Sequence, residues 1–489
     1  MIEKRPINIL LLTNRDSDNV GDQVIEACDI SLVETVMKNL GISDSEYVIN
    51  SRAAAIVPKK YLKTRDVDYL KGAEKTIKDS DLIIFGGAPL FNYLYQDFYE
   101  RTAVTLEFAE KYNVPVIFSA IGIESYHEDN EKCQRLKETL NFNCVKQITT
   151  RDGFEFLEKY IENENIKIAK VSDPAVFSKL VFKNFISEKS QKKKIGLFII
   201  RRNAFKDNGY RFTSVDAAKM WLDIIEELNS RGFDYEVITS GHFGDEAFVD
   251  NIIRESNLSE TKCVFNINSP EDLIPKISSY DAIVSCRLHP SIISFSFEVP
   301  SLGLIWNNKV EKFYKSFGYG DRAISVENID VKALVDKVEA VITEGVTQNK
   351  DELITVYTSL FSGIKSVLKP EEEIDAFTYD ELVTKMAPYN SVTEAEKNDK
   401  LKRKFRRTYN SYNTLFIKTR NNQQEFESLQ KLLRETYKEY DITKKTLKAT
   451  EMELENTKKQ LEKFQRLSER SLIRIFASRV KRFLKRVLK

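Results

Sequence analysis

The chain has 489 residues, of which 75 are Lys or Arg and 74 are Asp or Glu, so its formal net charge is close to zero. That length exceeds one ordinary core and predicts two globular domains with additions, while the neutral balance argues against a protein that coats nucleic acid. The five scattered cysteines form no CxxC pair and argue against a disulfide framework or a zinc site. The apolar runs are short, which predicts a cytoplasmic protein without a signal peptide or membrane span.

The first half of the chain alternates short apolar runs with amphipathic stretches, a pattern that predicts a parallel, doubly wound α/β sheet. The expected strands are 7–13, 82–85, 114–121 and 147–150, and the expected helices are 22–40, 91–112 and 131–140. We therefore expect an N-terminal Rossmann-like domain over residues 1–187. The polar run 188–194 indicates a linker.

The second half repeats this alternation and predicts another Rossmann-like domain, catalytic, over residues 195–368. The expected strands are 195–200, 235–239, 263–265, 282–286 and 301–305, and the expected helices are 215–230, 245–255, 271–279, one that starts at Pro290, and 331–368. Because ligands of such sheets bind beyond the carboxyl ends of the strands, the loops at those ends are the candidate site.

The region after residue 368 changes character. Residues 369–420 are polar and weakly patterned, and we interpret them as a connector. From Phe426 to Phe464 apolar residues recur with heptad spacing, weakened by threonines, which predicts a coiled coil over 421–470 that makes a homo-oligomer. The alternative is a long solvated helix that packs on its own domain.

The last nineteen residues, 471–489, contain seven Lys or Arg and no acid. Their apolar residues fall on one helical face, as in a helix that lies in an anionic membrane surface. The apolar face consists of Leu472, Phe476, Val480, Phe483 and Val487, broadened by Ile473, Leu484 and Leu488. A helix for a protein partner and incidental contact with nucleic acid remain as alternatives.

The tripeptide Arg287-Leu288-His289 is the most informative motif, because it follows a buried-strand pattern and precedes a helix. A helix start favours an anion, and an arginine adds a planar charged fork suited to phosphate or carboxylate. A histidine can give or take a proton near neutral pH. The motif therefore indicates anion binding combined with proton transfer. The alternative is that Arg287 pairs with a structural carboxylate and His289 caps the helix.

Further candidate residues lie at other strand ends. The loop Asn19-Val20-Gly21-Asp22 combines a turn glycine with a candidate helix cap at Asp22. The paired glycines Gly86 and Gly87 allow close approach of a ligand, although they are also ordinary turn formers. Arg201 follows the first strand of the second half, and Lys309 follows its last one. No metal site, nucleophile motif, P-loop or GxGxxG is found, so we expect no metal and no resident cofactor.

Together these loops resemble the polysaccharide pyruvyl transferase family over roughly residues 7–320. The matching motifs, in chain order, are Asn19-Val20-Gly21-Asp22, Gly86-Gly87-Ala88, Arg151-Asp152, Asp173-Pro174-Ala175, Arg201, Arg287-Leu288-His289 and Lys309. The chain departs from the family pattern at Asn203, where the family often has Asp. The resemblance does not cover the region after residue 368.

The resemblance implies two Rossmann-like halves in a GT-B-like arrangement, followed here by the long C-terminal helix or coiled coil. It also implies transfer of a pyruvate unit from phosphoenolpyruvate (PEP) to hydroxyls of a surface polysaccharide or its lipid-linked precursor, forming a ketal. His289 is then the candidate general acid beside Arg287. The residues expected to bind substrate are Asn19, Gly21, Asp22, Gly86, Gly87, Arg201 and Lys309.

A membrane-linked acceptor would explain a protein that is peripheral at the inner face of the cell membrane. Two other functions fit parts of the sequence. One is a GT-B-type glycosyltransferase that uses a nucleotide sugar, and the other is a non-catalytic coiled-coil scaffold for polysaccharide assembly.

Overall fold

The computed structural model describes residues 5–93, 98–256, 258–439 and 444–487. They divide into two compact units. The first, which we call the sheet unit, comprises residues 1–241 and 264–391, and the second, the helical unit, comprises residues 242–263 and 392–489. Each unit is described by itself.

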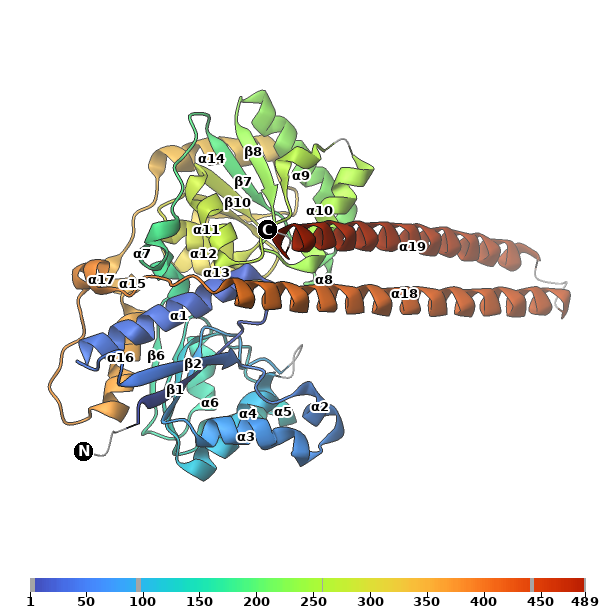
Figure 1. Ribbon diagram of the computed structural model, residues 1–489. Coiled ribbons are helices and arrows are strands. Elements are labelled where there is room, and N and C mark those ends of the chain that lie inside the picture. Colours follow the sequence, from blue (N-terminus) through green and yellow to red (C-terminus); the bar gives the residue numbers. More distant parts are fainter. Residues whose placement is uncertain (1–4, 94–97, 257, 440–443, 488–489) are drawn as a thin grey trace. The chain divides into compact units, whose positions relative to one another are not determined.

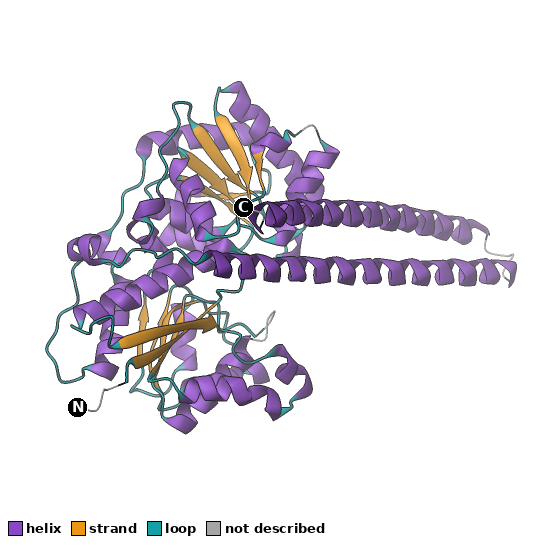
Figure 2. Ribbon diagram, viewed as in Figure 1, coloured by secondary structure: helices purple, strands orange, loops and turns teal. Residues whose placement is uncertain are grey.

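The strands form two parallel six-stranded sheets, drawn in orange in Figure 2. The first sheet has the order β2 (Tyr47–Ala53), β1 (Ile7–Thr13), β3 (Leu82–Gly86), β4 (Val116–Ile121), β5 (Val145–Thr150), β6 (Lys167–Lys170). The second has the order β12 (Ala323–Ser325), β11 (Ser301–Ile305), β10 (Ala282–Ser285), β7 (Lys194–Phe198), β8 (Asp234–Ile238), β9 (Cys263–Val264). Two parallel α/β sheets were predicted and are confirmed; β2, β6 and β12 were not predicted.

Helices cover both faces of each sheet (Figure 1). Those along the first half are α1 (Val20–Asn39), α2 (Lys59–Thr64), α3 (Lys71–Lys78), α4 (Phe98–Tyr112), α5 (Glu131–Leu140), α6 (Phe154–Tyr160) and α7 (Ser178–Val181). Those of the second half are α8 (Ala204–Asp207), α9 (Ser214–Ser230), α10 (Phe243–Glu255), α11 (Pro270–Ser279), α12 (Leu288–Ser296), α13 (Asn308–Ser316) and α14 (Val331–Glu344). Short 3-10 helices are η1 (Val67–Leu70), η2 (Pro174–Phe177), η3 (Lys183–Phe185), η4 (Glu260–Lys262) and η5 (Gly320–Arg322).

The burial of strand β1 explains why its sequence lacks polar alternation. Ile9 and Leu11 join the core on the α1 side, whereas Leu10 and Leu12 join the core beneath α3, α4 and α5. Since successive side chains of a strand point to opposite faces, a strand buried on both faces is apolar at every position.

The predicted single helix 331–368 is wrong in two respects. It is broken into α14, α15 (Lys350–Leu353) and α16 (Thr355–Leu368), and α14 ends at Gly345, whose φ of 70° a glycine adopts without strain. In addition, α16 packs on the first sheet instead of completing the second. Gln147 Nε2 donates to Ser359 O at 2.8 Å, and Tyr357 Oη donates to Asn39 Oδ1 at 2.6 Å.

The region after α16 contains more helix than the predicted connector. Helix α17 (Tyr379–Lys385) is followed by α18 (Glu394–Glu439), which therefore begins inside residues 369–420, and by α19 (Lys444–Val487). Helices α18 and α19 lie side by side (Figure 1). They run antiparallel, because Gln465 Nε2 donates to Thr419 O at 3.4 Å whereas the later residue Phe483 contacts the earlier residue Phe405 edge-to-face.

This hairpin divides the region 421–470, for which a coiled coil was predicted, between two helices. The heptad positions divide between α18 and α19, and two of them, Tyr440 and Thr443, lie outside the described residues. Phe426 of the seam is 7% exposed, whereas Leu429 and Phe464 are 51% and 47% exposed. A coiled coil between chains stays a prediction.

The predicted membrane face of 471–489 is used in part for packing inside the helical unit. Leu472 is only 3% exposed, and the ring of Phe476 contacts Phe405 and Tyr409 of α18, whereas Ile473 and Leu484 are 54% and 48% exposed. The helix itself was predicted correctly, and Leu488 of the predicted face lies outside the described residues. None of the described helices is long and apolar enough to cross a membrane.

Candidate active site

Three cations lie at the carboxyl ends of neighbouring strands of the second sheet. Strand β10 pairs with β7 on one side and with β11 on the other. Arg201 follows β7, Arg287 follows β10, and Lys309 follows β11. Since carboxyl ends of parallel strands share one edge of a sheet, the topology brings together three residues that are far apart in the sequence.

Helix α12 begins at Leu288, two residues earlier than predicted, so Arg287 is its N-cap residue and His289 lies in the first turn. Ser285 holds the turn, because its buried Oγ accepts from Arg287 N at 3.0 Å and donates to Arg287 O at 2.7 Å. These two hydrogen bonds fix the backbone of the motif.

The imidazole of His289 meets the start of α1 in the other half of the sheet unit. Asn19 Nδ2 lies 3.2 Å from His289 Nδ1, and Asn19 Oδ1 accepts from Gly21 N at 3.3 Å as the N-cap of α1. Since the cap occupies the amide oxygen, the amide nitrogen faces the imidazole as a donor. Nδ1 of a neutral ring is then the acceptor, which leaves the proton on Nε2.

Gly21 permits this contact because it has no side chain. A Cβ at Gly21 would overlap the Cβ, Cγ and Nδ1 atoms of His289. The predicted cap at Asp22 is wrong, because Asn19 caps α1. Asp22 instead places Oδ1 3.9 Å from His289 Nδ1 and accepts through Oδ2 from Asn14 Nδ2 at 3.1 Å.

Burial lowers the pKa of His289 from its ordinary value to about 4. The carboxylate of Asp22 opposes this shift, while Arg151, Arg287 and Lys309 add to it. The side chain is only 12% exposed, and three cations around it disfavour a fourth positive charge. His289 is therefore neutral near pH 7.

Arg151 and Asp173 form a buried ion pair between the ends of β5 and β6. Asp173 also caps η2, since its Oδ1 accepts from Ala175 N at 2.9 Å. The sequence contained both motifs, but no role was predicted for either residue. Their effect on the site is electrostatic, because Arg151 lowers the pKa of His289.

The paired glycines face α1 in the core of the first half. A Cβ at Gly86 would overlap the carboxylate of Asp29, and one at Gly87, whose φ is 49°, would overlap Ile25. Close packing thus explains both glycines, and their contact with a substrate stays a prediction. Asp29 is 2% exposed, and burial raises its pKa well above the ordinary value.

Arg201 forms an ion pair with Asp207 at the end of α8, with its side chain 38% exposed. Asn203, the departure from the family pattern, has a φ of 63° as the N-cap residue of α8. Asn adopts this left-handed conformation more readily than most residues.

A cavity of about 400 Å³ lies in the sheet unit beside Lys309. Its lining combines cations from both halves, Lys170 and Lys309 among them, with the apolar residues Leu288, Phe313 and Phe317, and it also includes the carboxylates of Asp173 and Glu352. An organic anion or a sugar with an apolar face would suit such a lining. In the part of the chain that the structure describes, no group of three or more His, Cys, Asp or Glu residues could hold a metal ion.

The site thus joins an amide-held imidazole, a carboxylate and cations from two halves of the sheet unit. A model of the polysaccharide pyruvyl transferase family matches residues 19–308, which span the site from Asn19 to the start of α13. The chain belongs to the polysaccharide pyruvyl transferase family. It is accordingly a transferase, and a saccharide acceptor is plausible for a member of this family.

Solved structures similar to this polysaccharide pyruvyl transferase include two sugar-nucleotide epimerases. The UDP-GlcNAc 2-epimerase from Methanocaldococcus jannaschii is 12% identical with a TM-score of 0.45, covering 72% of this chain and 97% of the epimerase. A second UDP-N-acetylglucosamine 2-epimerase is 10% identical with a TM-score of 0.46, covering 77% of this chain and 100% of the epimerase. No curated protein sequence gives a significant match.

Proposed function

We propose that this polysaccharide pyruvyl transferase moves a pyruvate unit from PEP to two hydroxyls of a sugar and forms a ketal. The observation that carries the proposal is the placement of His289, held by Asn19, among Arg287, Arg151 and Lys309. The reaction requires an acid for the methylene carbon and cations for phosphate and carboxylate, and these residue types supply both.

The chemistry balances without a cofactor. His289 gives a proton to C3 of PEP, the first sugar hydroxyl bonds to C2, and the C2–O bond to phosphate breaks with its electron pair on the phosphate. The first hydroxyl gives its proton to His289 as it bonds, which restores the imidazolium. The second hydroxyl then bonds to C2, and its proton goes to the departing phosphate. Arg201, Arg287 and Lys309 would bind the anionic groups and stabilise the departing phosphate.

A neutral imidazole is a poor acid, so the donor substrate has to change the protonation of His289. Burial is the main cause of the low pKa of His289, and the cations Arg287 and Lys309 add to it. The phosphate and carboxylate of PEP would offset these cations. The bound anion would therefore raise the pKa of His289 and lead it to take up a proton.

We further propose that the acceptor is a lipid-linked polysaccharide precursor at the inner face of the cell membrane. The basic segment 471–489 supports this location. The cavity beside Lys309, whose lining includes cations and apolar side chains, is the proposed place for part of the acceptor.

The test is to incubate the protein with ¹³C-labelled PEP and candidate lipid-linked glycans in D₂O. We expect phosphate release, transfer of all three labelled carbons to the glycan, and one deuterium in the new methyl group. His289→Gln serves as the matched control. Release of a nucleoside diphosphate from a nucleotide sugar, with no label transfer from PEP, would favour a glycosyltransferase, and no turnover of either donor would favour a scaffold.

A further inference from the structure

Helix α18 contains a second basic segment that carries no acid. Residues 400–424 include eight Lys or Arg and no Asp or Glu, and residues 470–489 likewise include eight Lys or Arg and no acid. The hairpin places the two segments together, because Phe405 contacts Phe476 and Phe483 edge-to-face, each with 5.8 Å between ring centroids. The base of the hairpin is therefore far more basic than 471–489 alone.

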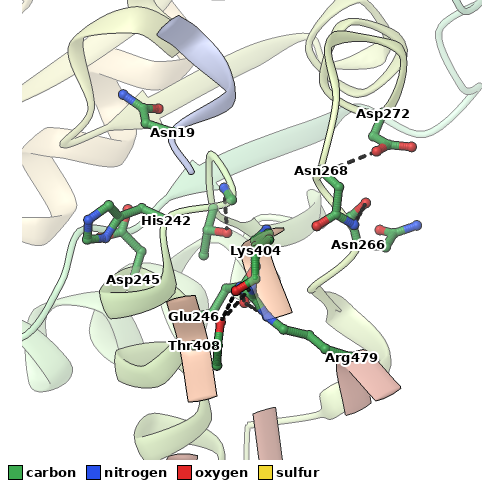
Figure 3. A network of polar contacts seen from close by, with 12 residues as sticks. Asn19, His242, Asp245, Glu246, Asn266, Asn268, Asp272, Lys404, Thr408 and Arg479 are labelled. Atoms are coloured by element: carbon green, nitrogen blue, oxygen red, sulfur yellow. Dashed lines mark hydrogen bonds and ion pairs between the residues drawn. The ribbon is translucent and has the colours of Figure 1, made fainter. Parts of the chain in front are cut away.

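The inner cations of this base are neutralised by helix α10. Arg479 and Lys404 pair with Glu246, which is 1% exposed, and Thr408 Oγ1 accepts from Arg479 Nη1 at 3.3 Å (Figure 3). Arg474 pairs with Asp250 at 3.2 Å. These contacts hold α10, α18 and α19 together, so the buried cations serve packing.

The outer side of α18 carries a different set of residues. At 3.6 residues per turn, one stripe about 100° wide contains Lys402, Arg406, Tyr409, Phe416, Ile417 and Arg420, all of them exposed. Tyr409, Phe416 and Ile417 are 49%, 42% and 57% exposed. A matching stripe on α19 contains Ile473, Ala477, Lys481 and Leu484, also exposed.

We propose that these two exposed stripes, which we call the basic stripes, bind an anionic lipid surface. Lys and Arg would lie among the headgroups, and the exposed aliphatic and aromatic side chains would enter the acyl boundary. A nucleic acid would use the charges but gives Ile417, Ile473 and Leu484 no apolar partner, so the composition favours lipid. The inference builds on the proposed membrane location, but it moves the contact away from Leu472 and Phe476, which pack inside the helical unit. It places the contact on the outer stripes, which include Ile473 and Leu484 of the predicted apolar face.

The test is co-sedimentation with vesicles of phosphatidylcholine alone and of two parts phosphatidylcholine to one part phosphatidylglycerol. The full chain should bind only the anionic vesicles. The triple variant Arg406→Gln, Arg420→Gln, Lys481→Gln should bind about a hundredfold more weakly, since each cation near such a surface contributes roughly fivefold. This assay measures vesicle binding and not catalysis. A negative result would therefore reject the lipid-binding proposal without bearing on pyruvyl transfer.

The matched control is Lys458→Gln, Lys459→Gln, Lys463→Gln, which removes three exposed cations from the distal part of α19. The control should bind like the unaltered chain. A second variant, Ile417→Gln with Leu484→Gln, should lose the binding that persists at high salt. Point variants are required because deletion of 471–489 would also remove Arg479 from Glu246.

Three outcomes would overturn the proposal. They are absence of binding to anionic vesicles, equal losses in the triple variant and its control, and tighter binding of single-stranded RNA than of the anionic vesicles. Circular dichroism melts of each variant establish that the hairpin is retained.

Discussion

His289 is the residue on which the proposed chemistry depends most. We predict that His289→Gln lowers turnover about a hundredfold or more while the affinity for PEP changes little, because a general acid acts mainly in the transition state. Steady-state kinetics with calorimetric titration of PEP separate the two effects. Near-normal turnover in the folded variant would remove His289 from the mechanism.

The depressed pKa of His289 has a consequence for stability. The folded-state pKa of about 4 lies below the ordinary value near 6.5, so the unfolded chain binds the proton first as pH falls. The contribution of the neutral, buried imidazole to the free energy of unfolding is fully present above pH ~6.5. It is lost as pH falls towards 4, by about 3 kcal/mol. Urea unfolding across this range should show a smaller loss for His289→Gln than for the unaltered chain.

The same pKa predicts proton uptake when PEP binds. Calorimetry near neutral pH in buffers of different ionisation enthalpy should show up to one proton taken up per PEP, and His289→Gln should abolish the uptake. Binding without any buffer dependence would show that His289 stays neutral and would exclude it as the acid.

Arg287 should bind the donor PEP through a bidentate pair of charge-assisted hydrogen bonds. We predict that Arg287→Ala weakens PEP binding by about 10- to 100-fold and that Arg287→Lys restores only part of it, because Lys lacks the planar fork. Calorimetric titration measures the loss. Equal PEP affinity of the unaltered chain and the two Arg287 variants would show that Arg287 does not bind PEP.

At the scale of elements, Arg479 joins α19 to α10 through the buried Glu246. Arg479→Ala would leave Glu246 paired with Lys404 at 3.6 Å. Removing one partner of a buried ion pair typically lowers the stability of the folded state by about 3–5 kcal/mol. We therefore predict a lower melting temperature for the helical unit, measured by circular dichroism, whereas Lys459→Ala on the exposed part of α19 should change it little.

At the scale of the whole molecule, self-association through the hairpin stays a prediction. Leu429, Met452 and Phe464 are 51%, 69% and 47% exposed on α18 and α19, although the sequence pattern assigned two of them to a buried seam. A second copy of the hairpin would cover them. Light scattering at micromolar concentration should show an oligomer, and Leu429→Gln with Phe464→Gln should lower its mass.

Much of the fold followed from the sequence alone, because strands buried on both faces and amphipathic helices are encoded locally. The limits of α5 and β11 were predicted to the residue, and the motif around His289 was placed correctly at a strand end. By contrast, the polar or short strands β2, β6 and β12 have no strong apolar run and were missed.

Contacts between distant segments were decided only by the tertiary structure. The bond between Asn19 and His289 spans 270 residues, and the low pKa of His289 depends on burial and on cations from both halves of the sheet unit. The return of α16 to the first sheet and the pairing of Arg479 with Glu246 depend likewise on distant partners. Sequence periodicity shows which face of a helix is apolar, but which surface covers that face is set by the folded chain.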